Sequence, residues 1–354
     1  MKKIATLLVL GGLLAAITAQ AQVDIYITGS TAFRANAYRS IRALYGASLA
    51  NQNPPHDASA NNLVTFQGTI SSLFGAQIVT IRTAYNGSAA GIQALVQNQN
   101  LTFLSLATPG DTNTITHQAD LAFSDVFQAT TAFPTPALND SLVGVQPFVY
   151  VKSAGTPASV TNINIQQLQS FLANGVMPLS YFTGNTSDDA SLIYLVGRDS
   201  GSGTRITIER DALFIGGPLL WAPDTNCNWN VSAGFSSGSG IVGVLNGACG
   251  PAIGYVGIAD AKNVNSGNNI IRYDGQLPFS GSVNTPDYTP VYKGLYSNWG
   301  YEHLFRRSSA SANIQTFRTG LATEINNDLA TSTTAIQIGR MQVSRPADGG
   351  PISP

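Results

Sequence analysis

The sequence carries little charge. Only 10% of its 354 residues are charged, and 18 basic residues against 19 acidic ones give a net charge of −1. Nucleic acids and anionic membranes bind strongly basic surfaces, so this composition excludes polybasic binding to either partner. Hydrophobic residues make up 44% of the chain, whereas disordered chains combine low hydrophobicity with high charge. We therefore expect a folded chain, and its length favours two domains at roughly 100 to 200 residues per domain.

Cysteine and histidine are also scarce. The three histidines, His56, His117 and His303, show no metal-ligand spacing among themselves or with the two cysteines, so no metal or other cofactor is predicted. The cysteines are Cys227 and Cys249. In an oxidising compartment a lone pair of this kind is more often a disulfide than a metal site, which favours a bond between them.

The N-terminus has the three parts of a secretory signal peptide. Met1-Lys2-Lys3 is positively charged, residues 4–17 are apolar, and Ala19-Gln20-Ala21 is a small-x-small cleavage site. The apolar run is shorter than the roughly 20 residues that a membrane-spanning helix needs. No cysteine follows the cleavage site to carry a lipid. We expect residues 1–21 to be removed, the mature chain to begin near Gln22, and the protein to be periplasmic or secreted.

The mature chain repeats one local order, an apolar strand, a small polar turn and a helix. The expected strand and helix pairs are 23–28 with 32–45, 77–85 with 89–97, and 191–197 with 204–214. Strands that alternate with helices indicate a mostly parallel sheet covered on both faces, so the predicted class is α/β.

Further apolar runs at 120–124, 142–151 and 252–258 are predicted buried strands, and the last two are suited to cross between two lobes. Polar segments rich in Asn, Ser, Gly and Pro are predicted loops, at 51–62, 107–116 and 262–290. The expected division is lobe one over residues 22–145 plus 257–340, lobe two over 146–256, and an extended or frayed tail over 341–354.

The three turns point to anion binding. They are Gly29-Ser30-Thr31, Asn86-Gly87-Ser88 and Ser202-Gly203-Thr204, each at an expected helix start. A helix N-terminus has unpaired N–H groups and about half a positive charge, so it can hold an anion without a basic side chain. Ordinary helix capping by Ser and Thr is the alternative for each turn taken alone.

Two charged residues make the anion hypothesis more specific. Arg198 ends a strand just before the third turn, where its guanidinium can donate to two oxygens of a tetrahedral anion. Asp125 follows the expected strand 120–124 and has the wrong sign for an anion site unless it accepts a proton from the ligand. A carboxylate can accept from hydrogen phosphate but only repels sulfate, which carries no proton at neutral pH. A turn or N-cap role is the alternative for Asp125.

These motifs resemble the periplasmic phosphate-binding proteins of ABC phosphate uptake systems. The resemblance runs in family order from about residue 24 to about 305. Its segments are Gly29-Ser30-Thr31, Tyr85-Asn86-Gly87-Ser88-Ala89-Ala90-Gly91, Ser124-Asp125, Arg198-x-x-Gly201-Ser202-Gly203-Thr204, Gly250-Pro251-Ala252-Ile253-Gly254-Tyr255 and Tyr296-Ser297-Asn298-Trp299-Gly300-Tyr301-Glu302. The Arg198 to Thr204 run is the specific one.

The resemblance implies the type II periplasmic binding protein fold, with two mixed, mostly parallel sheets joined by a two-crossing hinge. It also implies a monomer that captures inorganic phosphate between its lobes, delivers it to an ABC transporter permease, and is not an enzyme. The implied phosphate ligands are Thr31, Ala32, Ser88, Asp125, Arg198, Ser202, Gly203 and Thr204, with Ser30 as a further candidate. The family often has an acid two residues after the arginine, where this chain has Ser200 and instead carries Asp199.

Other functions remain alternatives. The site could take another oxyanion, or bind phosphate on the cell surface without a transporter. Gly234-Phe235-Ser236-Ser237-Gly238 fits the nucleophile elbow of a secreted serine hydrolase, with His303 and either Asp260 or Asp274 as partners. Gly238-Ser239-Gly240-Ile241-Val242-Gly243 fits a dinucleotide motif, but no clear strand precedes it, so a helix start in lobe two is expected there.

Overall fold

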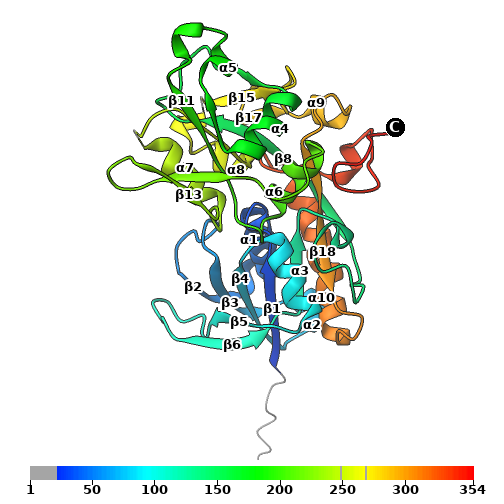
Figure 1. The fold of residues 1–354 in the computed structure, drawn as a ribbon. Helices are drawn as coiled ribbons and strands as arrows, with labels where there is room; N and C mark the ends of the chain where they lie inside the picture. The colour runs from blue at the N-terminus through cyan, green and yellow to red at the C-terminus, as the bar shows by residue number, and fades with distance from the viewer. Residues whose placement is uncertain (1–21, 248, 268) are drawn as a thin grey trace, which may run out of the picture.

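A computed structural model describes residues 22–247, 249–267 and 269–354. The predicted signal peptide lies outside the described residues. Figure 1 shows two lobes, with β1 to β6, α1 to α3 and α10 in lobe one and β11, β13, β15 and α4 to α8 in lobe two. Within the described ranges, no helix is both long and apolar enough to cross a membrane.

The longer elements agree with the expected strand–turn–helix units. The helices are α1 Arg34–Tyr45, α2 Ser71–Phe74, α3 Ser88–Val96, α4 Ile165–Asn174, α5 Ser180–Thr183, α6 Gly203–Asp211, α7 Gly238–Asn246, α8 Ile258–Ala261, α9 Thr289–Tyr292 and α10 Ala312–Leu329. The main strands are β1 Gln22–Gly29, β2 Leu49–Asn53, β3 Leu63–Thr69, β4 Ile78–Tyr85, β7 Leu121–Ser124, β8 Leu142–Lys152, β9 Asn162–Ile163, β10 Val176–Pro178, β11 Leu192–Val196, β14 Ala252–Gly257, β15 Ile270–Tyr273 and β18 Trp299–Arg306. Three two-stranded ribbons are formed by β5 Asn100–Leu104 with β6 Thr114–Gln118, β12 Leu220–Pro223 with β13 Trp229–Ser232, and β16 Ser280–Ser282 with β17 Thr285–Asp287.

Lobe one is a mixed sheet covered on both faces. Strand β1 lies between β4 and β7 and pairs with both in parallel. Alternate residues of β1 enter different cores: Ile25 and Ile27 pack with α1 and α10, whereas Tyr26 packs with α3 and the β5–β6 ribbon. This period of two is what a strand between two layers requires. Parallel neighbours also bring the ends of β1, β4 and β7 to one edge of the sheet.

Lobe two has the order β10-β11-β14-β8, with β15 on the other edge of β8. Only the β11–β14 and β9–β15 pairs are parallel. Apart from these two and the pairs of β1 with β4 and β7 in lobe one, the strand pairs of the described sheets are antiparallel, so there are more antiparallel pairs than predicted.

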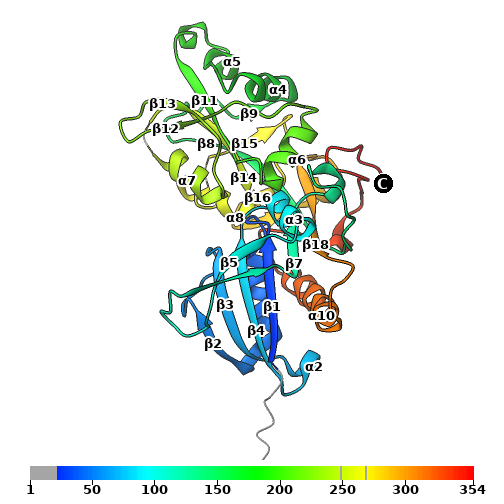
Figure 2. The same cartoon turned by 60° about the horizontal axis from the view of Figure 1, so that its bottom comes forward.

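Two adjacent antiparallel strands, β8 and β18, connect the lobes (Figure 2). The first part of β8 pairs with β18, and the second part, from Phe148, pairs with β14. The expected crossing at 142–151 is therefore present. The second crossing is β18 rather than 252–258, because β14 stays paired within lobe two. Strand β15 pairs with β8 and β9, which places residues 270–273 with lobe two although the sequence grouped 257–340 with lobe one and predicted a loop there.

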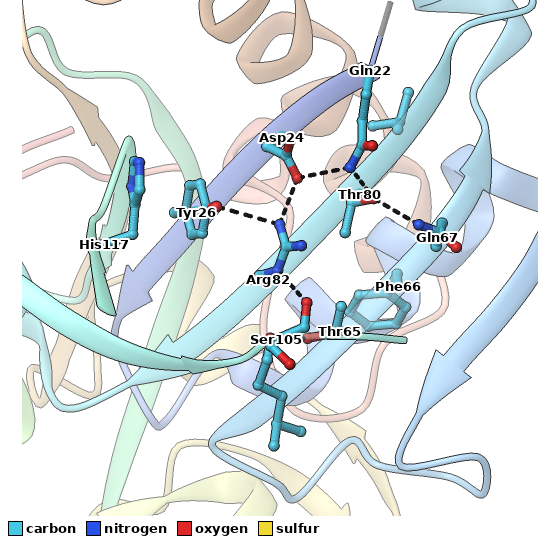
Figure 3. Close-up of polar contacts among 12 residues, drawn as sticks. Gln22, Asp24, Tyr26, Thr65, Phe66, Gln67, Thr80, Arg82, Ser105 and His117 are labelled. Atoms are coloured by element: carbon cyan, nitrogen blue, oxygen red, sulfur yellow. Dashed lines mark hydrogen bonds and ion pairs between the residues drawn. The ribbon is translucent and has the colours of Figure 1, made fainter. Parts of the chain in front are cut away.

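A polar cluster attaches the β5–β6 ribbon to the outer face of the lobe-one sheet (Figure 3). Arg82 on β4 donates to Asp24 on β1 at 2.6 Å and to the carbonyl of Ser105, which follows β5, at 3.0 Å. His117 on β6 stacks on Tyr26 with ring centroids 3.9 Å apart. The guanidinium is paired on two sides, so this cluster fixes the ribbon and leaves no free charge for a ligand.

The C-terminal tail contains no helix or strand over residues 341–354, as predicted, but it is not frayed. Arg345 and Asp348 are buried. Arg345 donates to the carbonyls of Trp299 and Ser297 at 3.0 and 2.6 Å, and Asp348 accepts from the backbone N–H of Phe127 at 2.9 Å. Charged side chains held in this way tie the tail to the body of the protein.

The two cysteines lie in lobe two. Cys227 and Cys249 form a disulfide with their Cα atoms 4.9 Å apart. The bond attaches the turn between β12 and β13 to the segment that follows α7, and the Trp229 indole N–H donates to the Cys249 carbonyl at 2.9 Å.

Candidate anion-binding site

The predicted site residues stand at strand ends and helix starts of both lobes. In lobe one, Thr31 and Ala32 lie between β1 and α1, Ser88 is the first residue of α3, and Asp125 follows β7 directly. In lobe two, Arg198 lies two residues beyond β11, Ser202 is the N-cap of α6, and Gly203 and Thr204 open that helix. The carboxyl ends of neighbouring strands are where open α/β sheets bind ligands.

Direct contacts between the lobes bring these residues together. Arg198 Nη2 donates to Thr31 Oγ1 at 3.1 Å. Thr204 Oγ1 donates to Asp125 Oδ2 at 3.3 Å. Within lobe one, the backbone N–H of Asp125 donates to Ser88 Oγ at 3.3 Å. Each side chain in this set is at most 5% exposed, so the set lies in a closed interlobe position.

The backbone N–H groups at this place are mostly unpaired. Among the residues that the structure describes, no acceptor is bonded to the N–H of Thr31, Ala32, Ser88, Gly203 or Thr204. All five residues are buried. Buried N–H groups without an acceptor are rare in proteins, and several of them at helix starts suit an anion. The next two N–H groups of α3, from Ala89 and Ala90, donate instead to the carbonyl of Gly201 in lobe two.

Main-chain carbonyls orient Arg198, which sequence analysis did not anticipate. Nε donates to the Phe235 carbonyl at 3.0 Å and Nη2 to the Ser236 carbonyl at 2.8 Å. The family acid two positions after the arginine is thus replaced by a turn of the chain, while Asp199 accepts from the Gly201 N–H at 3.1 Å. Gly234 allows this approach, since it has φ +91° and a Cβ there would touch the Arg198 carbonyl. In the sequence, the only sign of this close approach is the glycine that precedes Phe235.

Gly203 is required for the close contact of α6 with lobe one. A Cβ at this position would touch Asp125 Oδ1 and the Ser88 side chain. The start of α6 therefore lies directly against the carboxylate that was predicted to accept the ligand's proton.

Ser202 caps α6, and its hydroxyl accepts from the Arg205 N–H at 3.3 Å. This hydroxyl therefore has the capping role, and its own O–H can still donate to a ligand. Ser30 has a similar role in the first turn, where its hydroxyl accepts from the Phe33 N–H at 3.2 Å.

Burial controls the charges at the site. It raises the pKa of Asp125 to about 6, against the opposing effects of Arg198 and a hydrogen bond from Thr204. Burial also lowers the pKa of Arg198, and the charge of Asp125 counteracts that change. At neutral pH the site therefore combines an ionised acceptor with one guanidinium.

The residues of the hydrolase alternative do not form its triad. His303 is fully buried, and its Nδ1 lies 2.8 Å from Asp140 Oδ2 rather than near Asp260 or Asp274. No strand directly precedes Ser236, whose carbonyl accepts from Arg198.

The dinucleotide motif is a helix start, as expected, since α7 begins at Gly238. A Cβ on Gly238 would touch Asp260 Oδ2. Within the described part of the chain, no group of three or more His, Cys, Asp or Glu residues could hold a metal ion.

Two solved structures share the architecture of this chain. One is described as a phosphate ABC transporter substrate-binding protein from Clostridium perfringens with bound phosphate; it has a TM-score of 0.58 and 16% identity, over 89% of this chain and 99% of that chain. Another is an ABC-type phosphate transport receptor from Vibrio cholerae, with a TM-score of 0.53 and 17% identity, over 88% and 99%. This chain has the two-lobed fold of periplasmic binding proteins. No protein-family model and no curated protein matches its sequence.

Proposed function

We propose that this protein is an extracytoplasmic solute-binding protein that captures inorganic phosphate between its lobes for uptake by an ABC transporter. The observation that carries the proposal is the pair of buried interlobe contacts, Arg198 with Thr31 and Thr204 with Asp125. These contacts bring together a guanidinium, unpaired backbone N–H groups and a carboxylate acceptor. The sequence had pointed to these same residues as ligands of one tetrahedral anion. The two similar solved structures are named as phosphate-binding or phosphate-transport proteins, which adds support.

In this proposal each group has a defined task. Arg198 and the N–H groups of Thr31, Ala32, Ser88, Gly203 and Thr204 donate to the phosphate oxygens, with the hydroxyls of Thr31, Ser88, Ser202 and Thr204 beside them. Asp125 accepts the proton of hydrogen phosphate, which distinguishes this ion from sulfate. A ligand that contacts both lobes favours the closed form over the open one. The anion undergoes no chemical change.

The test is calorimetry and thermal shift of phosphate-free mature protein against phosphate, sulfate and related oxyanions. Phosphate at 100 times its dissociation constant should add about 2.7 kcal/mol to the free energy of unfolding. Arg198→Ala should raise the phosphate Kd about 100-fold, because two charge-assisted hydrogen bonds are lost. Arg272→Ala, which removes an exposed guanidinium of lobe two, is the control and should bind as the wild type does.

The same panel decides between this proposal and its alternatives. If another oxyanion binds most tightly, that ion is the ligand in place of phosphate. If no oxyanion gives a response, the anion site is refuted. Location outside the cytoplasm, cleavage before Gln22, a monomeric state and delivery to a permease belong to the proposal. Loss of phosphate uptake in cells that lack the protein would separate a transport role from surface binding without a transporter.

A further inference from the structure

A second carboxyl group lies beside the proposed anion site and has no described partner. Glu302 on β18 is 0% exposed, and neither of its carboxylate oxygens has a hydrogen-bond partner among the described residues. An ionised carboxylate in such a position would lack both water and a counter-charge, which is costly. The neutral, protonated form of Glu302 is therefore the stable one.

The β7–β18 register, continued one residue past the end of β7, places Glu302 opposite Asp125. His303 on β18 pairs with Ser124 on β7, so the next residues in this antiparallel pair are Glu302 and Asp125. The β8–β18 register shifts between Glu302 and His303, and such irregularities re-aim side chains next to functional sites. The ring contacts of His303 are with Phe305, Tyr301 and Phe127, on the face away from Glu302.

The unpartnered atoms around Glu302 complement one another. Tyr85 ends β4, and its buried hydroxyl has no described partner; neither does Asp125 Oδ1. Tyr85 offers one O–H donor and Asp125 Oδ1 offers an acceptor. A protonated Glu302 offers the donor that Asp125 Oδ1 lacks, whereas two ionised carboxylates could only repel each other.

The surrounding charges also keep the proton on Glu302. Burial, reinforced by the negative charge of Asp125, raises the pKa of Glu302 well above its ordinary value. The charge that acts on the pKa of Glu302 from a neighbouring element is that of Asp125. Arg198 acts on Asp125 from lobe two, and Asp348 of the tail acts on it with negative sign. Of the two acids, only Asp125 has a nearby guanidinium to stabilise its ionised form.

We propose that Glu302 is a positioning residue of the phosphate site: it remains protonated, donates toward Asp125, and so holds Asp125 as the ionised acceptor of the ligand's proton. This inference rests on the proposed function. It adds an acid that does not touch the ligand but sets the charge and the orientation of one that does.

The experiment compares Glu302→Gln, which keeps a neutral donor and acceptor, with Glu302→Leu, which keeps only the volume. Glu324→Gln on α10 changes a carboxyl group to an amide elsewhere in lobe one and is the control. For each phosphate-free mature protein, phosphate and sulfate Kd values are measured by calorimetry from pH 5 to pH 8. Infrared difference spectra at pH 7.5 detect the carbonyl stretch of a protonated carboxylic acid. Circular dichroism checks that each variant is folded.

We expect Glu302→Gln to bind phosphate within about 3-fold of the wild type, with the pH midpoint of sulfate binding moved by less than about 0.3. Glu302→Leu should weaken phosphate at least about 10-fold and shift that midpoint. The protonated-acid band should disappear in Glu302→Gln and persist in Glu324→Gln and Asp125→Asn.

A midpoint lowered by about one unit or more in Glu302→Gln would show that Glu302 is ionised and would overturn the inference. Wild-type phosphate binding by folded Glu302→Leu would do the same. Failure of the wild-type protein to bind phosphate would refute the proposed function instead, so the two failures are distinguishable.

Discussion

At the residue scale, the selectivity proposed for the site depends on one carboxyl group whose pKa is raised to about 6. Ionised Asp125 repels sulfate, whereas protonated Asp125 can donate to it. Sulfate keeps its charge between pH 5 and pH 8, so its affinity reports the state of Asp125 alone. Sulfate binding should tighten as pH falls through about 6, by up to about 100-fold between pH 8 and pH 5. Titration calorimetry measures this, and a similar profile in Asp125→Asn would assign the effect to another group.

The same carboxyl group should influence the stability of the phosphate-free protein in a predictable direction. The pKa in the folded state, about 6, lies above the ordinary value of 3.8, so the folded state binds more protons than the unfolded state between these values. The free energy of unfolding therefore falls as pH rises through 6. Asp125 should contribute about 1.4 kcal/mol more at pH 5 than at pH 8.

Urea unfolding of the wild type and of Asp125→Asn at both pH values tests this contribution. The pH 5 to pH 8 difference in the free energy of unfolding should be smaller in the variant by that amount. The buried acid Asp211, whose pKa is also raised, acts equally in both proteins. Equal differences in the two proteins would contradict the assignment.

At the element scale, sequence reasoning succeeded where hydrophobic period and turn chemistry agree. The three strand–turn–helix units were predicted, and their turns hold the proposed site. Helix α4 was missed, although Asn164 and Gln167 form a capping box whose two residues are visible in the sequence. Strand β15 was missed because its short run lies inside a polar segment, and its place is set by pairing with β8, a tertiary contact that no local pattern contains.

Most ligand candidates could be predicted because turn residues and Arg198 are local signals. Two features could not be predicted: the carbonyls that orient Arg198, and the position of the buried Glu302 opposite Asp125. Both depend on which distant segments meet, and a carbonyl has no sequence signature. The second hinge crossing was wrong for the same reason, since an apolar run such as 252–258 is equally suited to a central strand and to a crossing strand.

The start of helix α6 provides a prediction at this scale. Gly203→Ala would place a methyl group against Asp125 Oδ1 and Ser88, which must push lobe two away from lobe one. The phosphate Kd should therefore rise at least about 10-fold. Lobe two should stay folded, because alanine is a better helix former than glycine. Gly243→Ala is the matched control, because it lies in α7 and a Cβ there meets nothing within 4 Å. Calorimetry of both variants checks the result, and equal affinities would disprove the tight contact.

At the scale of the whole molecule, the tail contacts both lobes near the site. Arg345 lies 4.3 Å from the centroid of Trp299 and 3.8 Å from Asp211, at the end of α6 in lobe two. Asp348 accepts from the N–H of Phe127, two residues after Asp125 in lobe one. A segment bonded to both lobes restricts hinge motion and favours the closed form. We therefore expect the tail to add to stability and to slow the release of a bound ligand, whereas the sequence predicted only an extended or frayed end.

Replacing Arg345 tests this role of the tail. Arg345→Ala removes two hydrogen bonds and leaves Asp211 without its buried cation, so the free energy of unfolding should fall by about 2 to 4 kcal/mol. Deleting residues 341–354 should lower the free energy of unfolding by at least as much. It should also speed phosphate release, because the tail no longer links the two lobes. Arg340→Ala, which removes an exposed arginine just before the tail, should change neither quantity. Urea unfolding and stopped-flow release measure the two effects. If deletion lowers stability but leaves release unchanged, the tail stabilises the fold without restraining the hinge.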